Sequence, residues 1–157
     1  MKRLWAPWRV QYIHNPNPGG CIFCDKPKEN KDAENFILFR GNLNFVILNA
    51  FPYSPGHLMV VPYRHLGRLE DFITEERNEH YTLVSRAVGI LREGCHTESF
   101  NIGMNLGRTA GAGIDDHIHT HAVPRWNGDS NFMPVIGETR IISESLQEIY
   151  QRLKGKF

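Results

Sequence analysis

Long hydrophobic runs are missing from this sequence of 157 residues. No stretch reaches the roughly 18 consecutive apolar residues that a membrane-spanning helix needs, so we expect no membrane segment. The first ten residues contain lysine, arginine and tryptophan but lack the apolar centre of a secretory signal peptide. The sequence therefore predicts a protein that neither spans a membrane nor enters a secretory pathway.

The chain also has few cysteines and a small net charge. The chain has three cysteines, of which Cys21 and Cys24 form a Cys-x-x-Cys pair and Cys95 stands alone. An odd number of cysteines without a secretory signal argues against a disulfide framework and predicts a reducing, cytoplasmic location. The formal net charge of +1 excludes a strongly basic surface for nucleic acid. We therefore expect no nucleic-acid partner.

No internal repeat or low-complexity tract divides the chain, and its length suits one domain with a substantial core. Residues 1–20, rich in tryptophan, arginine and proline, predict an irregular N-terminal arm in front of a single domain at 21–157. Trp5 and Trp8 could stack on a nucleobase, but burial is the commoner use of such aromatics. We therefore favour an arm that its tryptophans anchor.

The hydrophobic pattern predicts three strands, a long helix, two further strands and a last helix. The expected strands are 36–40, 45–48, 57–62, 100–105 and 117–123. The polar segment 25–34 reads as a loop. Short links between the early strands, with one helical crossover later, predict an α+β fold in which helices cover one face of an antiparallel sheet of about five strands.

Both helices carry start signals. Thr74 precedes an acidic turn and is the expected N-cap of a helix of about 20 residues. Its expected buried face consists of Tyr81, Val84, Val88 and Leu91, and Gly94 is its expected end. Ser143 or Ser145 is the expected cap of the last helix, whose apolar face is Leu146, Ile149, Tyr150 and Leu153.

Three histidines alternate with other residues at His117, His119 and His121. In a strand all three would leave one face, and the residues between them the other. In a helix each step would turn them by roughly 200°. A row of imidazoles binds metal or performs acid–base and nucleophilic chemistry near neutral pH. The nucleophilic reading is favoured, because the outer rings can orient the middle one or donate protons to it.

A glycine-rich segment, 107–113, leads into the histidine row. Its backbone N–H groups could bind phosphate oxygens, although glycines also simply form turns. An imidazole that attacks phosphorus gives a phosphoramidate, which is labile enough to pass its group on. The segment and the row together predict nucleotidyl transfer.

Cys21 and Cys24 have the spacing of a zinc knuckle, which needs two further ligands. The alternatives are a redox pair, although no helix-start pattern typical of that motif accompanies it, or two inert cysteines. His65 and His117 are the most economical completion of a Cys2His2 tetrahedron. His14, His80 and His96 carry no pattern and are expected to be ordinary surface or core residues.

The sequence resembles the histidine-triad (HIT) family of nucleotide hydrolases and transferases. The resemblance extends over about residues 21–126 and rests on the His-φ-His-φ-His-φ-φ pattern at 117–123 and on the segment 55–62. Thr120 departs from the pattern, because the family usually has a larger apolar residue there. The resemblance implies a HIT-like fold and a homodimer formed through the long helix and a shared sheet.

The resemblance also implies roles for single residues. His119 matches the nucleophile that forms a nucleotidyl-histidine intermediate, and His121 matches the histidine that contacts the α-phosphate and assists the leaving group. His57 matches an active-site histidine beside the phosphates. The expected substrate-binding residues are Asn49 for the ribose, Asn105 for phosphate, and Gly111 and Gly113 of the glycine-rich segment. In zinc-bearing members the ligands match Cys21, Cys24, His65 and His117. A zinc-dependent hydrolase would need an open coordination position, but two thiolates and two histidines fill a tetrahedron, so we expect a structural zinc ion.

Residues 110–114 and 122–126 look most like the branch of bacterial diadenosine tetraphosphate phosphorylases and dinucleoside polyphosphate hydrolases. Residues 4–9 and 127–132 support the same branch. The resemblance implies cleavage of dinucleoside polyphosphates, with orthophosphate as the favoured acceptor and water as the alternative. A second alternative is a nucleotide-binding or interaction module that has a structural zinc and no turnover.

Overall fold

The computed structural model describes residues 20–129 and 142–157. Of the predicted arm only Gly20 is described, so Trp5 and Trp8 lie outside the described residues. The predicted single domain at 21–157 is described except for 130–141.

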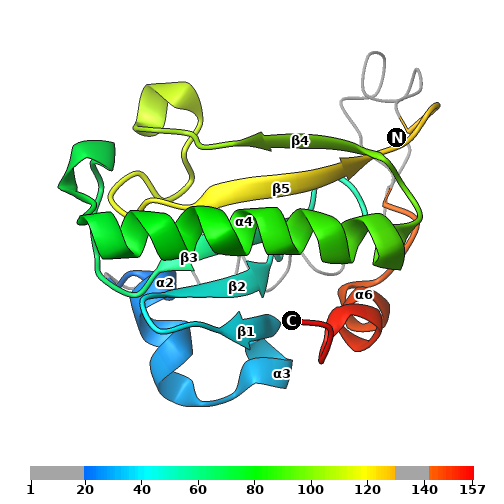
Figure 1. The fold of residues 1–157 in the computed structure, drawn as a ribbon, viewed down its shortest axis with the longest axis horizontal. Coiled ribbons are helices and arrows are strands. Elements are labelled where there is room, and N and C mark those ends of the chain that lie inside the picture. Colours follow the sequence, from blue (N-terminus) through cyan, green and yellow to red (C-terminus); the bar gives the residue numbers. More distant parts are fainter. Residues whose placement is uncertain (1–19, 130–141) are drawn as a thin grey trace, which may run out of the picture.

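A five-stranded antiparallel sheet forms the centre of the fold (Figure 1). Its strands are β1 (Ile37–Arg40), β2 (Asn44–Leu48), β3 (Leu58–Pro62), β4 (Ser99–Gly103) and β5 (Thr120–Arg125). The spatial order is β1-β2-β3-β5-β4. All residues of β2 and β3 are buried, because both faces of the sheet are covered there. The predicted α+β fold with five antiparallel strands is confirmed.

The register places His121, the last histidine of the row, between two neighbouring strands. His121 lies opposite Met59 of β3 and opposite Gly103 of β4. The prediction that the strand covers 117–123 is wrong at both ends, since β5 begins at Thr120 and continues to Arg125. Ile118 donates its N–H to the carbonyl of Leu66 at 2.8 Å instead of pairing within the sheet. The first two histidines therefore precede the regular part of the strand.

The helix α4 (Thr74–Cys95) runs across one face of the sheet (Figure 1). The predicted cap is wrong by one position: Thr74 is the first helical residue, and the Glu76 carboxylate accepts the N–H of Ile73 at 3.3 Å. Gly94 does not end the helix, which His96 terminates in the left-handed conformation. A Cβ at Gly94 would lie 2.6 Å from Leu153, so glycine there permits close packing of the last helix.

The buried face of α4 is rotated from the predicted one. Tyr81 is 55% exposed and Val88 is half-buried, whereas Val84 and Leu91 are buried as expected. The face is centred on buried His80, Leu83, Val84, Ala87 and Leu91. The prediction counted only apolar side chains and so passed over the buried histidine.

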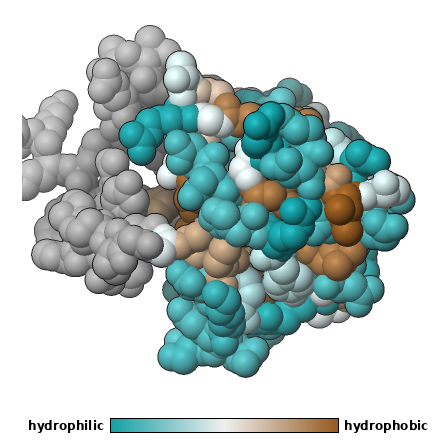
Figure 2. Space-filling view, turned by 90° about the vertical axis from the view of Figure 1, so that its left-hand side faces the viewer, coloured by the Kyte–Doolittle hydropathy of each residue, from teal (hydrophilic) through white to brown (hydrophobic). Residues whose placement is uncertain are grey.

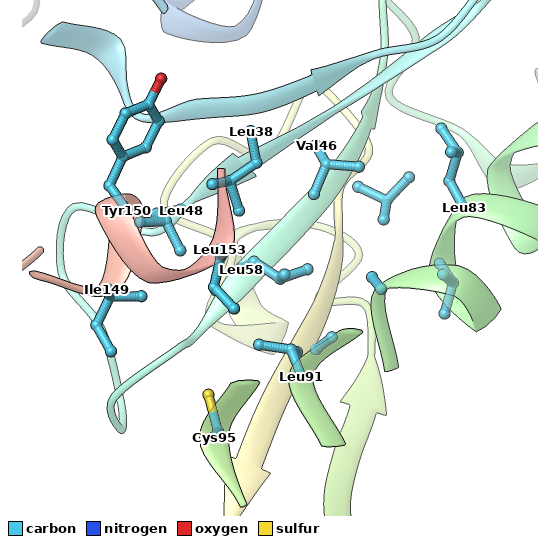
Figure 3. Close-up of a cluster of buried hydrophobic side chains, with 14 residues drawn as sticks. Leu38, Val46, Leu48, Leu58, Leu83, Leu91, Cys95, Ile149, Tyr150 and Leu153 are labelled. Carbon is cyan, nitrogen blue, oxygen red and sulfur yellow. The ribbon is translucent and has the colours of Figure 1, made fainter. Parts of the chain in front are cut away.

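The C-terminal helix α6 (Leu146–Leu153) completes the cover of this face. Its predicted cap is confirmed, since Ser145 accepts the N–H of Glu148 and donates to the Glu148 carboxylate. Figure 3 shows Ile149, Tyr150 and Leu153 beside residues of the sheet and the end of α4. This cluster is the larger part of the core.

Short helical segments cover the opposite face, where a loop was predicted. They are α2 (Ile22–Asp25), η1 (Lys26–Glu29) and α3 (Asp32–Asn35). Phe23 of α2 is 2% exposed and packs on Phe45, Met59 and Val61 of the sheet. The prediction of helices on one face therefore holds for α4 and α6 only.

Two further short helices, η2 (Leu69–Asp71) and η3 (Arg108–Ala110), lie in the connections before α4 and β5. In the part of the chain that the structure describes, no helix is long and apolar enough to cross a membrane. On the side shown in Figure 2, hydrophobic residues form separate patches among hydrophilic ones.

Candidate active site and adjoining metal-binding cluster

The three histidines of the row share the side of the sheet that α2 covers. The ring centroids of His119 and His121 are 4.9 Å apart, and Phe23 lies 5.0 Å from His119 and 5.5 Å from His117. Thr120 points to the other side and contacts α4. The predicted alternation is confirmed, although two of the histidines precede the strand. All three are buried.

His119 is held as a neutral ring with a free nitrogen lone pair. Its Nδ1 donates to the carbonyl of His117 at 2.8 Å. A neutral imidazole carries one hydrogen, so Nε2 is the unprotonated nitrogen. Burial lowers the pKa of His119, which keeps the ring neutral near pH 7. This is the form of histidine that can attack an electrophile.

A hydrogen-bonded relay fixes the tautomers of His57 and His121. The N–H of Tyr53 donates to His57 Nδ1 at 3.0 Å, so the hydrogen of the neutral His57 ring is on Nε2. His57 Nε2 lies 2.9 Å from His121 Nδ1 and donates to it. The hydrogen of His121 is therefore on Nε2. That nitrogen is buried and has no hydrogen-bond partner among the described residues.

An unpaired buried donor costs about 1–3 kcal/mol, so the His121 Nε2 hydrogen calls for an acceptor from a ligand. An oxygen of a bound phosphoryl group would satisfy it. The site thus presents a nucleophilic nitrogen on His119 and a hydrogen donor on the neighbouring His121. Sequence reasoning grouped these rings, but the assignment of donor and acceptor atoms comes from their partners.

The buried histidines predict a loss of stability in mild acid. Burial, and secondarily the charge of His119, lowers the pKa of His121 from 6.5 to about 4, and burial lowers that of His80 to about 4. Between pH 6.5 and about pH 4, both rings are mostly neutral in the folded chain and mostly protonated in the unfolded chain. Their contribution to stability is complete above pH 6.5 and is lost as the pH falls toward 4. Each contributes a slope of up to about 1.4 kcal/mol per pH unit.

We therefore expect the free energy of unfolding in urea to fall by about 2 kcal/mol or more between pH 7 and pH 5. Partners lower the pKa values of the Glu76 and Glu79 carboxylates, so these groups stay ionised over this range. A free energy of unfolding that stays flat or rises on acidification would contradict the neutral state of these histidines.

The predicted substrate-binding residues lie at different places around the histidines. Asn49 is next to the relay: its N–H donates to the carbonyl of His57 at 2.9 Å, and its Oδ1 accepts the N–H of Phe51. Asn105 follows β4 two residues after Gly103, the partner of His121. The roles of Asn49 toward the ribose and of Asn105 toward phosphate stay predictions.

The glycine-rich segment contains η3, and several of its amides bond within it. Gly111 donates to the carbonyl of Arg108 at 2.9 Å, and Ala112 donates to that of Gly107 at 3.4 Å. Gly111 needs to be glycine because its φ is +91°. The proposed use of Gly111 and Gly113 for phosphate binding stays a prediction.

The predicted metal ligands form one cluster. The ligand atoms of Cys21, Cys24, His65 and His117 all lie within 4.8 Å of one another. His117 Nδ1 is 3.1 Å from the sulfur of Cys21 and 3.6 Å from that of Cys24, which is 3.3 Å from His65 Nδ1. Around a tetrahedral zinc ion a sulfur and a nitrogen are about 3.6 Å apart. These donors fit such an ion.

Neighbouring groups orient the ligand atoms toward the centre of the cluster. His117 Nε2 donates to the carbonyl of Pro62 at 2.8 Å, so its Nδ1 keeps the lone pair that a metal requires. On His65, Nε2 faces the carboxylate of Asp116 at 3.5 Å. Burial lowers the pKa of His117, which keeps this ligand neutral.

Cys21 stands immediately before α2 as its N-cap, so the expectation that no helix start accompanies the pair is wrong. The thiol chemistry still argues against a redox pair. Burial and the neighbouring Cys21 raise the pKa of Cys24 to about 11, whereas redox-active pairs have a lowered thiol pKa. A cation in the cluster would stabilise both thiolates.

Comparisons with known proteins show which family this chain is similar to. The family model described as "HIT domain" matches residues 30–128. The chain is 37% identical to a protein of Mycobacterium tuberculosis named AP-4-A phosphorylase, over 94% of this chain and 80% of that protein. It is 30% identical to the bis(5'-nucleosyl)-tetraphosphatase [asymmetrical] of Schizosaccharomyces pombe, over 59% of this chain and 50% of that protein.

A solved structure shares the fold. It is the crystal structure of a zinc-bound histidine triad family protein from Mycobacterium smegmatis, which is 28% identical to this chain with a TM-score of 0.70. The match covers 87% of this chain and 92% of that one. With the histidine row in place, the family model over most of the chain and this common fold, the chain belongs to the HIT domain family.

Proposed function

We propose that this protein cleaves dinucleoside polyphosphates by nucleotidyl transfer through His119, with orthophosphate as the acceptor. One observation carries the proposal: the rings of His119 and His121 have centroids 4.9 Å apart, and the first has an unprotonated Nε2 while the second has an Nε2 hydrogen without a partner among the described residues. The same site then holds a nucleophile and a donor for the oxygen of an attacked phosphate. The enzyme names of the relatives support this class of substrate.

In the first step His119 Nε2 attacks the α-phosphorus. The new N–P bond forms as the bond from phosphorus to the bridging oxygen breaks, and a nucleoside polyphosphate leaves. The Nδ1 hydrogen stays on His119, so the modified ring is cationic, and the carbonyl of His117 stabilises it. His121 donates to a phosphoryl or leaving oxygen, with His57 holding it in position.

In the second step the acceptor attacks the same phosphorus and His119 leaves as a neutral ring. With orthophosphate and diadenosine tetraphosphate the products are ADP and ATP. With water they are AMP and ATP. We favour orthophosphate, because the relative named as a phosphorylase matches 94% of this chain and the one named as a tetraphosphatase matches 59%.

Product analysis on diadenosine tetraphosphate, with and without orthophosphate, decides between the acceptors. We expect ADP and ATP in equal amounts, formed only when orthophosphate is present. AMP and ATP formed without orthophosphate would replace the phosphorylase by a hydrolase. No products from this or other nucleotide substrates would favour the non-catalytic binding module.

We also propose that the cluster of Cys21, Cys24, His65 and His117 holds a structural zinc ion. The sulfur-to-nitrogen distances of 3.1–3.6 Å and the zinc-bound relative support it. Four protein donors fill a tetrahedron and leave no position for substrate, so the bound ion would supply stability and no Lewis-acid chemistry. It would join the segment around α2 to the residues before β5.

We propose a cytoplasmic homodimer as the working form. The three cysteines are free thiols, which suits a reducing compartment. In the described part of the chain, β4 is at the edge of the sheet. Ile102 of β4 and Tyr81 of α4 are each about half exposed. A second copy would cover such an edge. Sedimentation equilibrium of the full chain measures the mass, and a monomer would overturn this assembly.

A further inference from the structure

A buried polar pair lies directly behind the two histidines of the proposed reaction. Thr120 stands between His119 and His121, and its side chain points to the opposite side of the sheet. There its Oγ1 lies 2.6 Å from Nε2 of His80, which comes from α4. Thr120 is 2% exposed and His80 is fully buried. The proposed mechanism uses neither residue.

The partners of Asn44 fix the direction of this hydrogen bond. Asn44 Nδ2 donates to the carbonyl of Glu76 at 3.1 Å and to the Glu79 carboxylate at 3.0 Å, so Oδ1 is the acceptor atom. Oδ1 lies 2.8 Å from His80 Nδ1, which therefore carries the hydrogen. His80 Nε2 keeps a lone pair and accepts the hydroxyl hydrogen of Thr120.

The frame that holds His80 also reaches the metal-binding cluster. The carboxylate of Glu76 pairs with Arg64, which precedes His65, at 2.6 and 2.7 Å. The carboxylate of Glu79 accepts the N–H groups of Asn42 and Leu43 at 2.7 Å. The first two turns of α4 are thus tied to the sheet by directional bonds at several points.

Packing alone does not account for the pair. Apolar side chains of similar size at positions 80 and 120 would fill the same space without burying a hydroxyl and an imidazole. A buried neutral hydrogen bond adds only about 1 kcal/mol of net stability, but it sets a distance and a direction. Because Thr120 stands between His119 and His121 in the chain, a fixed position of Thr120 would also fix the two reacting rings relative to each other.

We propose that His80 is a positioning residue: through its hydrogen bond to Thr120, it fixes the position of the backbone that joins His119 to His121. This inference rests on the proposed function. The hydrogen bond would fix the separation of the nucleophile and the hydrogen donor, and small errors in such a separation are costly for rate. His80 touches no reacting atom and transfers no proton.

Variants at Thr120 test the proposal by steady-state kinetics, measured well below each melting temperature. Thr120→Val keeps the β-branched shape but lacks the hydroxyl, and we expect kcat to fall about tenfold with KM changed less than about twofold. Thr120→Ser keeps the hydroxyl and should restore most of kcat. The control, Val84→Ala, removes buried methyl groups one turn further along α4 and should lower the melting temperature while leaving kcat unchanged.

Equal kcat values for Thr120→Val and Thr120→Ser, or an equal loss in Val84→Ala, would overturn the positioning role. Should Thr120→Val fail to fold, the double variant His80→Leu, Thr120→Val replaces both partners by apolar side chains. We expect it to fold and to show the same loss of kcat. Recovery of wild-type kcat in the double variant would mean that packing suffices.

A spectroscopic measurement separates this inference from the proposed function. In ¹⁵N-labelled full-length protein we expect His80 to carry its hydrogen on Nδ1, and the ring signals of His119 and His121 to shift in Thr120→Val but not in Thr120→Ser. Absence of turnover in the wild type would reject the proposed function alone. An Nε2 hydrogen on His80, or unchanged ring signals in Thr120→Val, would reject the positioning role whether or not the protein is active.

Discussion

Replacement of His119 by alanine is expected to reduce turnover of diadenosine tetraphosphate by about 10⁴-fold or more, with the fold intact. The variant removes the nitrogen that would bond to phosphorus. His117 also has an unprotonated nitrogen supported by a backbone carbonyl, but that nitrogen faces the sulfur atoms of Cys21 and Cys24. The side chain is 6% exposed and lies immediately before β5, where the backbone is outside the regular strand, so we expect a modest loss of stability. Initial rates and circular dichroism measure the two effects.

His121→Ala is the matched control, because it deletes the same side chain two residues away. We expect it to lower the rate by about 10²–10³-fold, since it removes a hydrogen donor and leaves the nucleophile. The covalent intermediate should still form in this variant. Turnover of folded His119→Ala at a rate near that of the wild type would exclude the covalent route.

Loss of a metal ligand is expected to have the second largest effect, and to act on stability. At a free zinc concentration 1,000 times the dissociation constant, bound zinc stabilises the folded chain by about 4 kcal/mol. Cys24→Ala should therefore lose bound zinc and about 4 kcal/mol, which lowers the melting temperature by roughly 10 °C in a domain of this size. Metal analysis and thermal unfolding test this expectation.

Cys95→Ala provides the control, since Cys95 is a buried cysteine of the hydrophobic core outside the cluster. It should keep its zinc and lose less stability. We expect Cys24→Ala to retain more of its rate than of its stability when assayed at low temperature. An equal zinc content in both variants, or a loss of rate in Cys24→Ala with an unchanged melting temperature, would contradict a structural role for the ion.

The sheet was predictable because the composition of its strands is recognisable in the sequence. The continuous apolar segments 45–48 and 58–62 are buried on both faces, as their lack of alternation indicates. Ser145 signals its helix through a capping box with Glu148. These signals are local, so the sequence alone carries them.

Other features depend on contacts between distant residues. Ile118 leaves the regular strand because its N–H bonds to Leu66, 52 positions earlier, which no local pattern reveals. His80 looked like a residue without a pattern because it lies in α4 and its partners, Asn44 and Thr120, come from two strands of the sheet. Its spacing from Val84 and Leu91 on the buried face was the one signal that could have placed it inside.

The same distinction between local signals and distant contacts applies to the candidate site. The histidine row and the Cys-x-x-Cys pair are visible as short motifs, and the cluster that joins Cys21 and Cys24 to His65 and His117 was inferred by economy of ligands. The tautomers were not predictable. They depend on a backbone N–H from Tyr53 and on carbonyl groups whose positions only the folded chain defines.

The most direct test of the covalent mechanism is capture of the intermediate. The protein is mixed with diadenosine tetraphosphate labelled at its α-phosphates, quenched in base, and digested for mass spectrometry. A phosphoramidate survives base and is lost in acid, so we expect label that resists alkali, disappears in acid and maps to His119. Turnover with no such adduct, or an adduct on another residue, would contradict nucleotidyl transfer through His119.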